Sequence, residues 1–391
     1  MYKKLLVFIA ACVGMSFFGI CMISMGSILP SLSAKLGISV LEASVLVIFL
    51  PTGIMAGSLL FGPIVDKWGY KYLLIVSSLM VALGLGGLSY FETLLSLQLS
   101  IFVAGIGGGI LNGLTNALVS DIATDAERGG KLSLLGVFYG LGALGLPALI
   151  GSLSYRFSYD AILQYISLFI LVCLVFFIFI SFPKAKQTQG VPLWSGFKLL
   201  GKPVLLLMSL ILFFQSAVEG VVNNWSTTYL ADLPGISSEQ ALFSLTCMVI
   251  GLTAARVLLT GLFRWIGERR VFIGSLSIAI LGFALLLLPS GGITEAYAGL
   301  ALVGVGVAAT FPVVFGILGR TYPQWSGTVF SIALVIALTG NTLLNYVMGL
   351  LANYGMLWTY PLFAIAMVSI MLILFLTYGK LSAQSKSPMS N

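Results

Sequence analysis

Twelve apolar runs, each long enough to cross a lipid bilayer as a helix, constrain this chain more than any other feature of its sequence. A helix needs roughly twenty apolar residues to span the hydrocarbon core. Only 8% of the 391 residues are charged and 59% are hydrophobic, whereas a soluble domain carries about a quarter of its residues as charges. The predicted spans are 6–30, 40–61, 72–90, 94–118, 132–153, 161–182, 203–230, 241–263, 271–288, 296–318, 328–352 and 357–378. We therefore predict an all-α membrane protein, and we exclude a soluble enzyme, a disordered regulator and a nucleic-acid-binding protein.

The longest connection between spans, Pro183 to Lys202, divides the chain into two sets of six. We expect an N-terminal six-helix bundle over 1–182, a central loop over 183–202 and a C-terminal six-helix bundle with a short tail over 203–391. If the N-terminus is cytoplasmic, 16 of the 19 Lys and Arg residues lie on that side, two lie outside and one lies within a span. The positive-inside rule then predicts that both termini and the central loop are cytoplasmic.

The chain has no histidine, and each of its four cysteines lies inside an apolar run without metal-ligand spacing. We therefore expect no metal site, no disulfide and no cofactor. Without histidine, the usual carrier of protons near neutral pH, any proton chemistry must fall to carboxylates.

Two glycine patterns within the spans are assigned to close helix packing. The run from Gly140 to Gly145 spells GxGxxG, but it lies in mid-span without the strand and the phosphate-binding helix N-terminus that a dinucleotide site requires. Gly105, Gly109 and Gly113 form a small-xxx-small face of the kind that lets membrane helices approach closely.

Matching loops follow the second span of each half. The first runs from Gly62 to Lys71 as GPIVDKWGYK, and the second runs from Gly261 to Arg270 as GLFRWIGERR. Each has glycine, then charge, then glycine and a basic cluster, which predicts a tight turn held at the anionic membrane surface. The carboxylate of Asp66 can meet the positive N-terminal end of a neighbouring helix.

This pair of loops resembles the signature of the major facilitator superfamily. Gly62, Asp66, Lys67, Gly69 and Lys71 match its G-x-x-x-D-[RK]-x-G-x-[RK] loop, while the second copy has Arg264 where aspartate is expected. The resemblance covers nearly the whole chain and implies two pseudo-symmetric six-helix bundles that rock about a central site lined by helices one, four, seven and ten. It implies that the loop residues and Arg264 control the conformational change.

Two further stretches resemble the fucose/glucose-permease-like sugar transporters of that superfamily. They are the Glu219, Trp225 and Tyr229 stretch of the seventh span and the TFPVVF stretch from Thr310 to Phe315 in the tenth. Departures weaken the match: the first span has no acid, and the fourth has Asn112 and Asn116 where an acid can stand. The arginine that opens helix four of drug/proton antiporters is replaced by Ile101.

Glu219 and Arg256 are the ionisable residues that lie well inside predicted spans. Such residues cost about 2.5–3.5 kcal/mol on insertion scales, so function is their default interpretation. Gln215, Glu219 and Asn223 recur every four residues and share one helix face. Glu219 can load a proton, bind a sugar hydroxyl or hold a neighbouring helix. Arg256 lies roughly 14 Å from Glu219 in depth at helical rise, too far for a direct ion pair, and it suits a gate, an anion contact or snorkelling.

Amide and aromatic side chains supply the other candidates for substrate binding. Asparagine amides donate and accept together, which suits a polyol, and aromatic rings can stack on the C–H faces of a sugar. The alternative is that the amides bridge helices. The candidate substrate-binding residues are Gln215, Glu219, Asn223, Asn224, Trp225, Asn112, Asn341, Phe311 and Phe17.

These features predict a secondary active transporter embedded in the lipid bilayer of a bacterial inner or cell membrane. The predicted substrate is a monosaccharide or a similar polyol. We expect a monomer that imports its substrate with a proton, Glu219 being the coupling carboxylate. An exporter of amphipathic compounds and an uncoupled sugar uniporter are the alternatives. A membrane-embedded enzyme is disfavoured, because the sequence has no histidine, no cysteine pair and a lone intramembrane carboxylate, and so offers no catalytic constellation. No phosphate-binding GxxxxGK[ST] loop occurs, so the energy for transport must come from a gradient.

Overall fold

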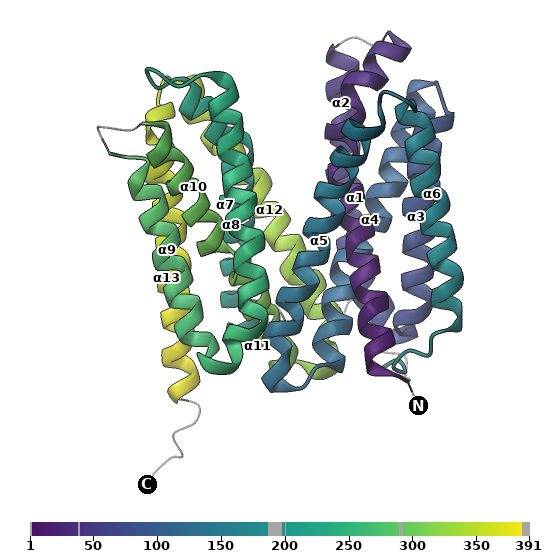
Figure 1. The fold of residues 1–391 in the computed structure, drawn as a ribbon. Coiled ribbons are helices and arrows are strands. Elements are labelled where there is room, and N and C mark those ends of the chain that lie inside the picture. Colours follow the sequence, from purple (N-terminus) through teal and green to yellow (C-terminus); the bar gives the residue numbers. More distant parts are fainter. Residues whose placement is uncertain (1, 38–39, 187–197, 200, 289–291, 385–391) are drawn as a thin grey trace. The chain divides into compact units, whose positions relative to one another are not determined.

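The computed structural model describes residues 2–37, 40–186, 198–199, 201–288 and 292–384, and the part of the chain that it describes is helical without a strand (Figure 1). Most of the predicted central loop 183–202 and the end of the tail lie outside these residues. The helices are α1 (Lys4–Leu36), α2 (Val40–Trp68), α3 (Tyr70–Tyr90), α4 (Leu94–Ile122), α5 (Asp125–Leu153), α6 (Tyr159–Phe179), α7 (Pro203–Ala231), α8 (Ser238–Trp265), α9 (Glu268–Leu285), α10 (Ile293–Val307), α11 (Thr310–Thr321), α12 (Ser326–Asn353) and α13 (Tyr360–Gln384). Short 3₁₀ turns precede the last two, at Pro323–Trp325 and Leu357–Thr359.

Every predicted span coincides with a helix or, for the tenth, with a pair of helices. Within the described residues, 11 segments are long and apolar enough to cross a membrane, α10 and α11 counting together as Ile293–Thr321. The ninth predicted span is α9, whose 18 residues include Glu268, Arg269 and Arg270 in the first turn. Its length lies at the short end of the range for a membrane-spanning helix.

The described helices fall into two compact units. Unit 1 contains residues 1–123, 135–196 and 322–331, and unit 2 contains 124–134, 197–321 and 332–391. The sequence-based division assigned 1–182 to one bundle and 203–391 to the other. The structure differs at two short segments: the first turns of α5 pack with unit 2, and the first turns of α12 pack with unit 1.

Within unit 1, α4 packs directly on α2 through the glycine face predicted from the sequence. A β-carbon at Gly105 would lie 2.6 Å from the carbonyl oxygen of Leu50, and one at Gly109 would lie 2.2 Å from that of Ile54. One at Gly113 would lie 2.0 Å from the ring of Phe61. The packing interpretation of this face is confirmed, because no larger residue fits at these distances.

The GxGxxG run also serves packing. A β-carbon at Gly142 of α5 would lie 2.1 Å from the carbonyl oxygen of Ser16 on α1, and one at Gly19 would lie 2.3 Å from that of Tyr139. The hydroxyl of Ser16 donates to the carbonyl of Phe138 at 3.0 Å. The backbones of α1 and α5 are therefore in contact, and the nucleotide-binding alternative is excluded.

The tenth span is interrupted in unit 2 at Ala308 and Ala309, between α10 and α11. Pro312 accounts for the break. A proline has no N–H to donate to the carbonyl four residues earlier, here that of Ala308, and its ring collides with that carbonyl. The break leaves α10 ending at Val307 in the interior of the span.

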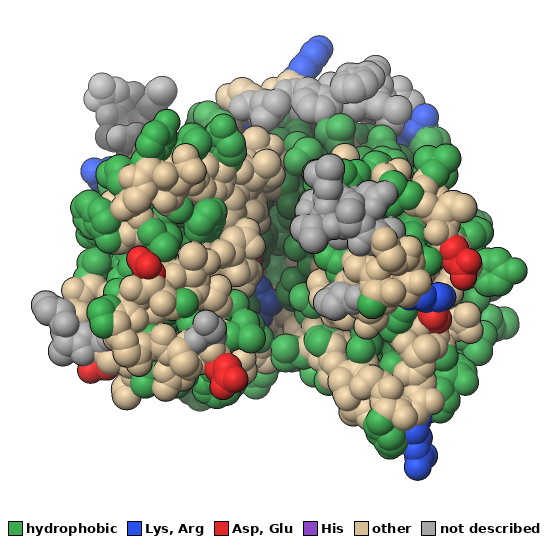
Figure 2. All heavy atoms as spheres, turned by 90° about the horizontal axis from the view of Figure 1, so that it is seen from above, with side chains coloured by type: hydrophobic (Ala, Val, Ile, Leu, Met, Phe, Trp, Pro, Cys, Tyr) green, Lys and Arg blue, Asp and Glu red, His purple; other side chains and the backbone are tan. Residues whose placement is uncertain are grey.

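The surface agrees with a bilayer environment. Large apolar side chains are exposed around the helices, among them Phe179 at 82% and Leu258 at 71%. Figure 2, a view onto the ends of the helices, shows hydrophobic side chains among other residues and only scattered charged ones.

Candidate functional site

The interior face of α7 carries a hydrogen-bonded pair made of Gln215 and Glu219. The amide nitrogen of Gln215 donates to Glu219 Oε1 at 2.8 Å and to the carbonyl oxygen of Val307 at 3.2 Å. Gln215 is fully buried, whereas Glu219 is only partly buried. A carboxylate is therefore joined through one amide to the end of α10, where the tenth span is interrupted.

Arg256 of α8 is buried at 8% exposure, and its charge acts on the carboxylate of Glu219. Helical rise predicts a difference in depth between Arg256 and Glu219 that is too large for a direct ion pair. In the structure, the charge of Arg256 still interacts with the Glu219 carboxylate. The backbone carbonyl of Arg256 also accepts a hydrogen bond from Ser133 at 2.8 Å. The buried position of Arg256 opposes the snorkelling alternative, because a snorkelling arginine extends its charge to the interface.

A pocket of about 570 Å³ lies between α7 and α12 in unit 2, and its mainly apolar lining includes the side chains of Asn224 and Asn345. The Asn224 amide donates to Asn345 Oδ1 at 3.0 Å, and the Asn345 amide donates to Asn341 Oδ1 at 2.8 Å. This volume is within the range of small-molecule sites, about 300–1,000 Å³. An asparagine offers two donors and one carbonyl acceptor, and the bond to Asn345 uses one donor of Asn224. The pocket can therefore bind a ligand that carries hydroxyl groups.

Glycines and a tryptophan shape this pocket. Gly220 lets the amides approach α7, since a β-carbon there would lie 2.3 Å from Asn341 Oδ1. Gly349 faces the ring of Trp225, with a β-carbon position 3.3 Å from Cζ2. Trp225 is partly buried and lines the pocket beside the amide chain. Asn223, the third member of the predicted α7 stripe, is exposed on the surface of unit 2.

The residues that the sequence singled out in the tenth span and at Tyr229 have different surroundings. Phe311 is partly buried and packs against Phe315, with ring centroids 5.7 Å apart. Tyr229 is 7% exposed and donates to the carbonyl of Leu286 at 3.0 Å, so it anchors the C-terminal end of α7.

Two substrate candidates lie in unit 1. Asn112 of α4 is partly buried, and its carbonyl and side-chain oxygens accept from Asn116 at 2.8 and 3.3 Å. Phe17 is 1% exposed and packs against Phe169 and Phe177. A ring buried to this extent in the aromatic cluster with α6 is not available to stack on a substrate, so Phe17 is not part of the proposed site.

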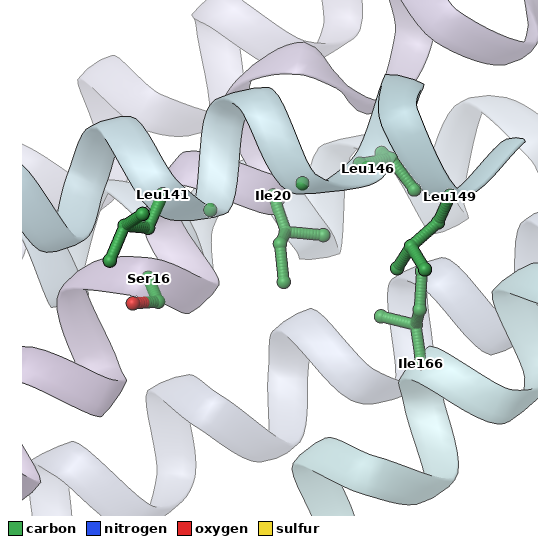
Figure 3. Close-up of a pocket in the computed structure, with 8 residues that line it drawn as sticks. Ser16, Ile20, Leu141, Leu146, Leu149 and Ile166 are labelled. Carbon is green, nitrogen blue, oxygen red and sulfur yellow. The ribbon is translucent and has the colours of Figure 1, made fainter. Parts of the chain in front are cut away.

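Unit 1 contains a smaller, apolar pocket of about 230 Å³. It lies among α1, α5 and α6, and its labelled side chains in Figure 3 are apolar except for Ser16. Ile20 lies between Leu141 and Leu149 along the pocket (Figure 3). Its volume is below the usual range for a drug-sized ligand.

Asp66 lies in the last turn of α2 and is 3% exposed. The loop predicted over 62–71 is helical in the structure except at Gly69. Its Oδ1 accepts from the N–H of Gly327 at 3.1 Å, and its Oδ2 accepts from the N–H and hydroxyl of Thr328 at 2.8 and 2.7 Å. These groups belong to the first turn of α12, where a carboxylate satisfies unpaired backbone donors and opposes the helix dipole. The predicted meeting of Asp66 with a helix N-terminus is confirmed.

The other loop residues position this contact. A β-carbon at Gly62 would lie 2.6 Å from the carbonyl oxygen of Gly327, and Gly69 has φ +82, a backbone conformation that favours glycine. Lys71 donates to the carbonyl of Ile178 at 2.7 Å. Lys67 is exposed and lies over the ring of Trp68, 5.0 Å from its centroid.

A charged cluster beside Asp66 was not predicted. Lys186, in the central loop, forms an ion pair with Asp121 at 2.6 Å and donates to Ser326 Oγ and to the carbonyl of Pro323, each at 2.6 Å. Tyr70 and Ser326 also donate to Asp121. In the sequence, Lys186 is one of several basic residues of the central loop, and its ion pair joins positions 65 residues apart, which no local pattern reveals.

The second loop has a different ion pair in unit 2. Arg264 is exposed, but Glu268 at the start of α9 accepts two hydrogen bonds from Arg320 at 2.9 and 2.6 Å. The first turns of α5 pack on the end of α8 nearby, where a β-carbon at Gly130 would lie 2.6 Å from the carbonyl of Thr260. The two loops therefore share close helix contact, but only the first has the aspartate cap.

Comparison with known proteins places these features in a family. The chain is 23% identical to the glucose/mannose transporter GlcP of Bacillus subtilis over 350 residues, which is 86% of each protein. The structure of the E. coli fucose:proton symporter FucP, solved in an outward conformation, shares the fold with a TM-score of 0.79 at 17% identity, covering 94% of this chain and 97% of FucP. A shorter match, 34% identical over 113 residues, joins 28% of this chain to 27% of the multidrug resistance protein MdtH of Aeromonas hydrophila.

The model of the Major Facilitator Superfamily matches residues 6–340. These residues include the Asp66 loop, the interrupted tenth span and most of both units. The chain is therefore a transporter rather than an enzyme, and it belongs to the major facilitator superfamily.

Proposed function

We propose that this transporter imports a neutral monosaccharide or a similar polyol together with a proton. The observation that carries the proposal is the pocket of unit 2, which is lined by Asn224, Asn345 and Trp225. Hydrogen bonds link the Asn224 amide to Asn345, and the Asn345 amide to Asn341 behind it. Amides bind hydroxyl groups, and an indole ring packs on the apolar face of a sugar. The similarity to GlcP and FucP, which transport sugars, supports the same substrate class.

Glu219 is the proposed proton-binding group. It lies on α7, five residues before Asn224, and its side chain is only partly buried. A carboxylate inside a membrane span raises the free energy of insertion, so function is its default interpretation. The partial exposure of Glu219 gives its carboxylate access to water. A substrate in the pocket and a proton on Glu219 can then bind the same helix.

Alternation between the two faces of the membrane requires contacts that break and re-form. We propose that the contact of Asp66 with the first turn of α12 is one of them, because residues 322–331 pack in unit 1 while α12 continues into unit 2. The excess of Lys and Arg on this side of the spans supports a cytoplasmic location for the Asp66 loop and for both termini. The protein would lie in a bacterial cell membrane.

Export of amphipathic compounds is the second candidate. The apolar pocket of unit 1 and the match to MdtH favour it, but that pocket is less than half the volume of the amide pocket. A counterflow experiment separates the two functions: purified protein in liposomes is loaded with one unlabelled compound, and uptake of its labelled form is measured for monosaccharides, polyols and an amphipathic cation. Exchange of a sugar supports the proposal. Exchange of the amphipathic cation alone would replace it with export.

A further inference from the structure

One glutamine in unit 2 connects the carboxylate of Glu219 to the break in the tenth span. Gln215 is fully buried, and its amide nitrogen donates both to Glu219 and to the carbonyl of Val307. A carbonyl only accepts hydrogen bonds, so the atom that faces Val307 must be the amide nitrogen. The orientation of the Gln215 amide is therefore fixed by the backbone of α10.

The second atom of the same amide is unsatisfied. Gln215 Oε1 is buried and has no hydrogen-bond partner among the described residues. A buried acceptor without a donor destabilises a fold, and such groups are uncommon in folded proteins. Gln215 Oε1 is thus an unused acceptor close to the carboxylate of Glu219. While Glu219 is charged, it has no proton to donate to this acceptor.

We propose that Gln215 transmits the protonation of Glu219 to the break between α10 and α11. When a proton from water neutralises the carboxylate, the new O–H group needs an acceptor, and Gln215 Oε1 is beside it. Oε1 reaches this O–H by a half-turn of the amide about its terminal torsion, which is a soft rotation. That half-turn removes the N–H from the Val307 carbonyl.

This rotation affects the backbone carbonyls at the end of α10, which already lack hydrogen-bond donors within the helix. Val307 closes α10, and the last carbonyls of a helix have no partner within it. Pro312 adds to the deficit, because it cannot donate to Ala308. Loss of the bond from Gln215 would leave the Val307 carbonyl unpaired in the interior of the span, so the uncharged state of Glu219 favours a rearranged break. Broken helices at membrane depth are the elements that move in many transporters.

The surroundings suit a proton better than a metal cation. The N–H of Gln215 points at the Glu219 carboxylate, and Arg256 on α8 is, among the described residues, the charged group that acts on it. Sodium or another metal ion would require converging oxygen atoms, whereas these neighbours present hydrogen and positive charge. This inference rests on the proposed role of Glu219 as the proton carrier.

Hydrogen–deuterium exchange on the full-length protein in lipid nanodiscs tests the proposal. The measured quantity is the exchange rate of the backbone amides of 308–311 and 313–315 at one pH, in wild type, Glu219→Gln, Gln215→Met and the double variant. Glu219→Gln mimics the protonated acid, because its amide can donate to Gln215 Oε1. We expect each single variant to speed exchange about fivefold, the effect of losing one hydrogen bond.

The double variant and a matched control make the result specific. If Gln215 carries the signal, the double variant exchanges no faster than either single one. Gln164→Met, on the exposed face of α6, should leave the rate unchanged. Unchanged exchange in Glu219→Gln, or rate effects that multiply in the double variant, would overturn the proposal.

Gradient-driven uptake measured on the same variants separates this inference from the proposed function. If Glu219→Gln changes exchange at the break but still accumulates sugar like wild type, the connection through Gln215 holds and proton coupling fails. If accumulation is lost while exchange at the break is unaffected, proton coupling holds and the role of Gln215 is refuted.

Discussion

The carboxylate of Asp66 caps the N-terminus of α12, where its Oδ2 accepts hydrogen bonds from both the N–H and the hydroxyl of Thr328 at 2.8 and 2.7 Å. The contact joins residues 262 positions apart in sequence. It combines helix capping with charge-assisted hydrogen bonding, each of which stabilises a helix N-terminus. The matching position after the second span of the other half is Arg264, which is exposed.

Removal of the Asp66 carboxylate should destabilise the protein. We expect Asp66→Ala to lower the free energy of unfolding by about 2 kcal/mol, because buried N–H groups of α12 lose their acceptor. Asp66→Asn keeps one acceptor oxygen and should lose less. Thermal unfolding in detergent measures both, with the exposed Asp232→Asn as control. Equal stability of Asp66→Ala and wild type would contradict the capping role.

Lys186 should matter although it lies in a loop. Lys186→Ala removes the positive partner of Asp121, whose side chain is only 12% exposed. We expect a loss of about 1–2 kcal/mol, between the values for surface and buried ion pairs. Lys184, two residues earlier and exposed, provides the matched control as Lys184→Ala. If the two alanine variants unfold at the same temperature, the ion pair with Asp121 contributes nothing.

The pair of Glu268 and Arg320 allows a charge-reversal test. Each single reversal, Glu268→Arg or Arg320→Glu, places like charges together and should reduce both stability and transport rate. The double reversal restores opposite charges and should recover part of the loss, on the order of 1 kcal/mol for a partly exposed pair. Thermal unfolding and initial uptake rates measure the effect. A double variant as impaired as the sum of the two single ones would show that the pairing is incidental.

The amide pocket predicts a specific loss of substrate affinity. Asn345→Ala removes the central amide of the chain from Asn224 to Asn341, and we expect the KM for the transported sugar to rise about tenfold, the effect of one or two hydrogen bonds. Trp225→Phe should retain more affinity than Trp225→Ala, because a smaller aromatic face remains. Asn353→Ala, exposed at the end of α12, is the control. An unchanged KM in Asn345→Ala would move the substrate site elsewhere.

The sequence predicted the spans well, because the length of an apolar run reports directly on the thickness of a bilayer. It predicted the cap at Asp66, because a carboxylate at a turn between helices can meet the positive N-terminal end of a neighbouring helix. It did not predict the interruption at Ala308, although Pro312 in mid-span was the available signal. It did not find the ion pair of Lys186 and Asp121, since contacts between distant positions leave no local pattern. The helix that contains Phe17 was predicted correctly, but hydrophobic periodicity could not show which neighbouring helix its ring contacts. In the structure the ring packs against Phe169 and Phe177 of α6.

The most direct test of the account is gradient-driven sugar uptake into proteoliposomes by wild type and Glu219→Gln. With the outside acidic, wild type should accumulate the sugar above its external concentration, while Glu219→Gln should only equilibrate it and still exchange labelled for unlabelled sugar. Equal accumulation by both proteins would contradict the role of Glu219. Equilibration by both, whatever the gradient, would make the protein a uniporter.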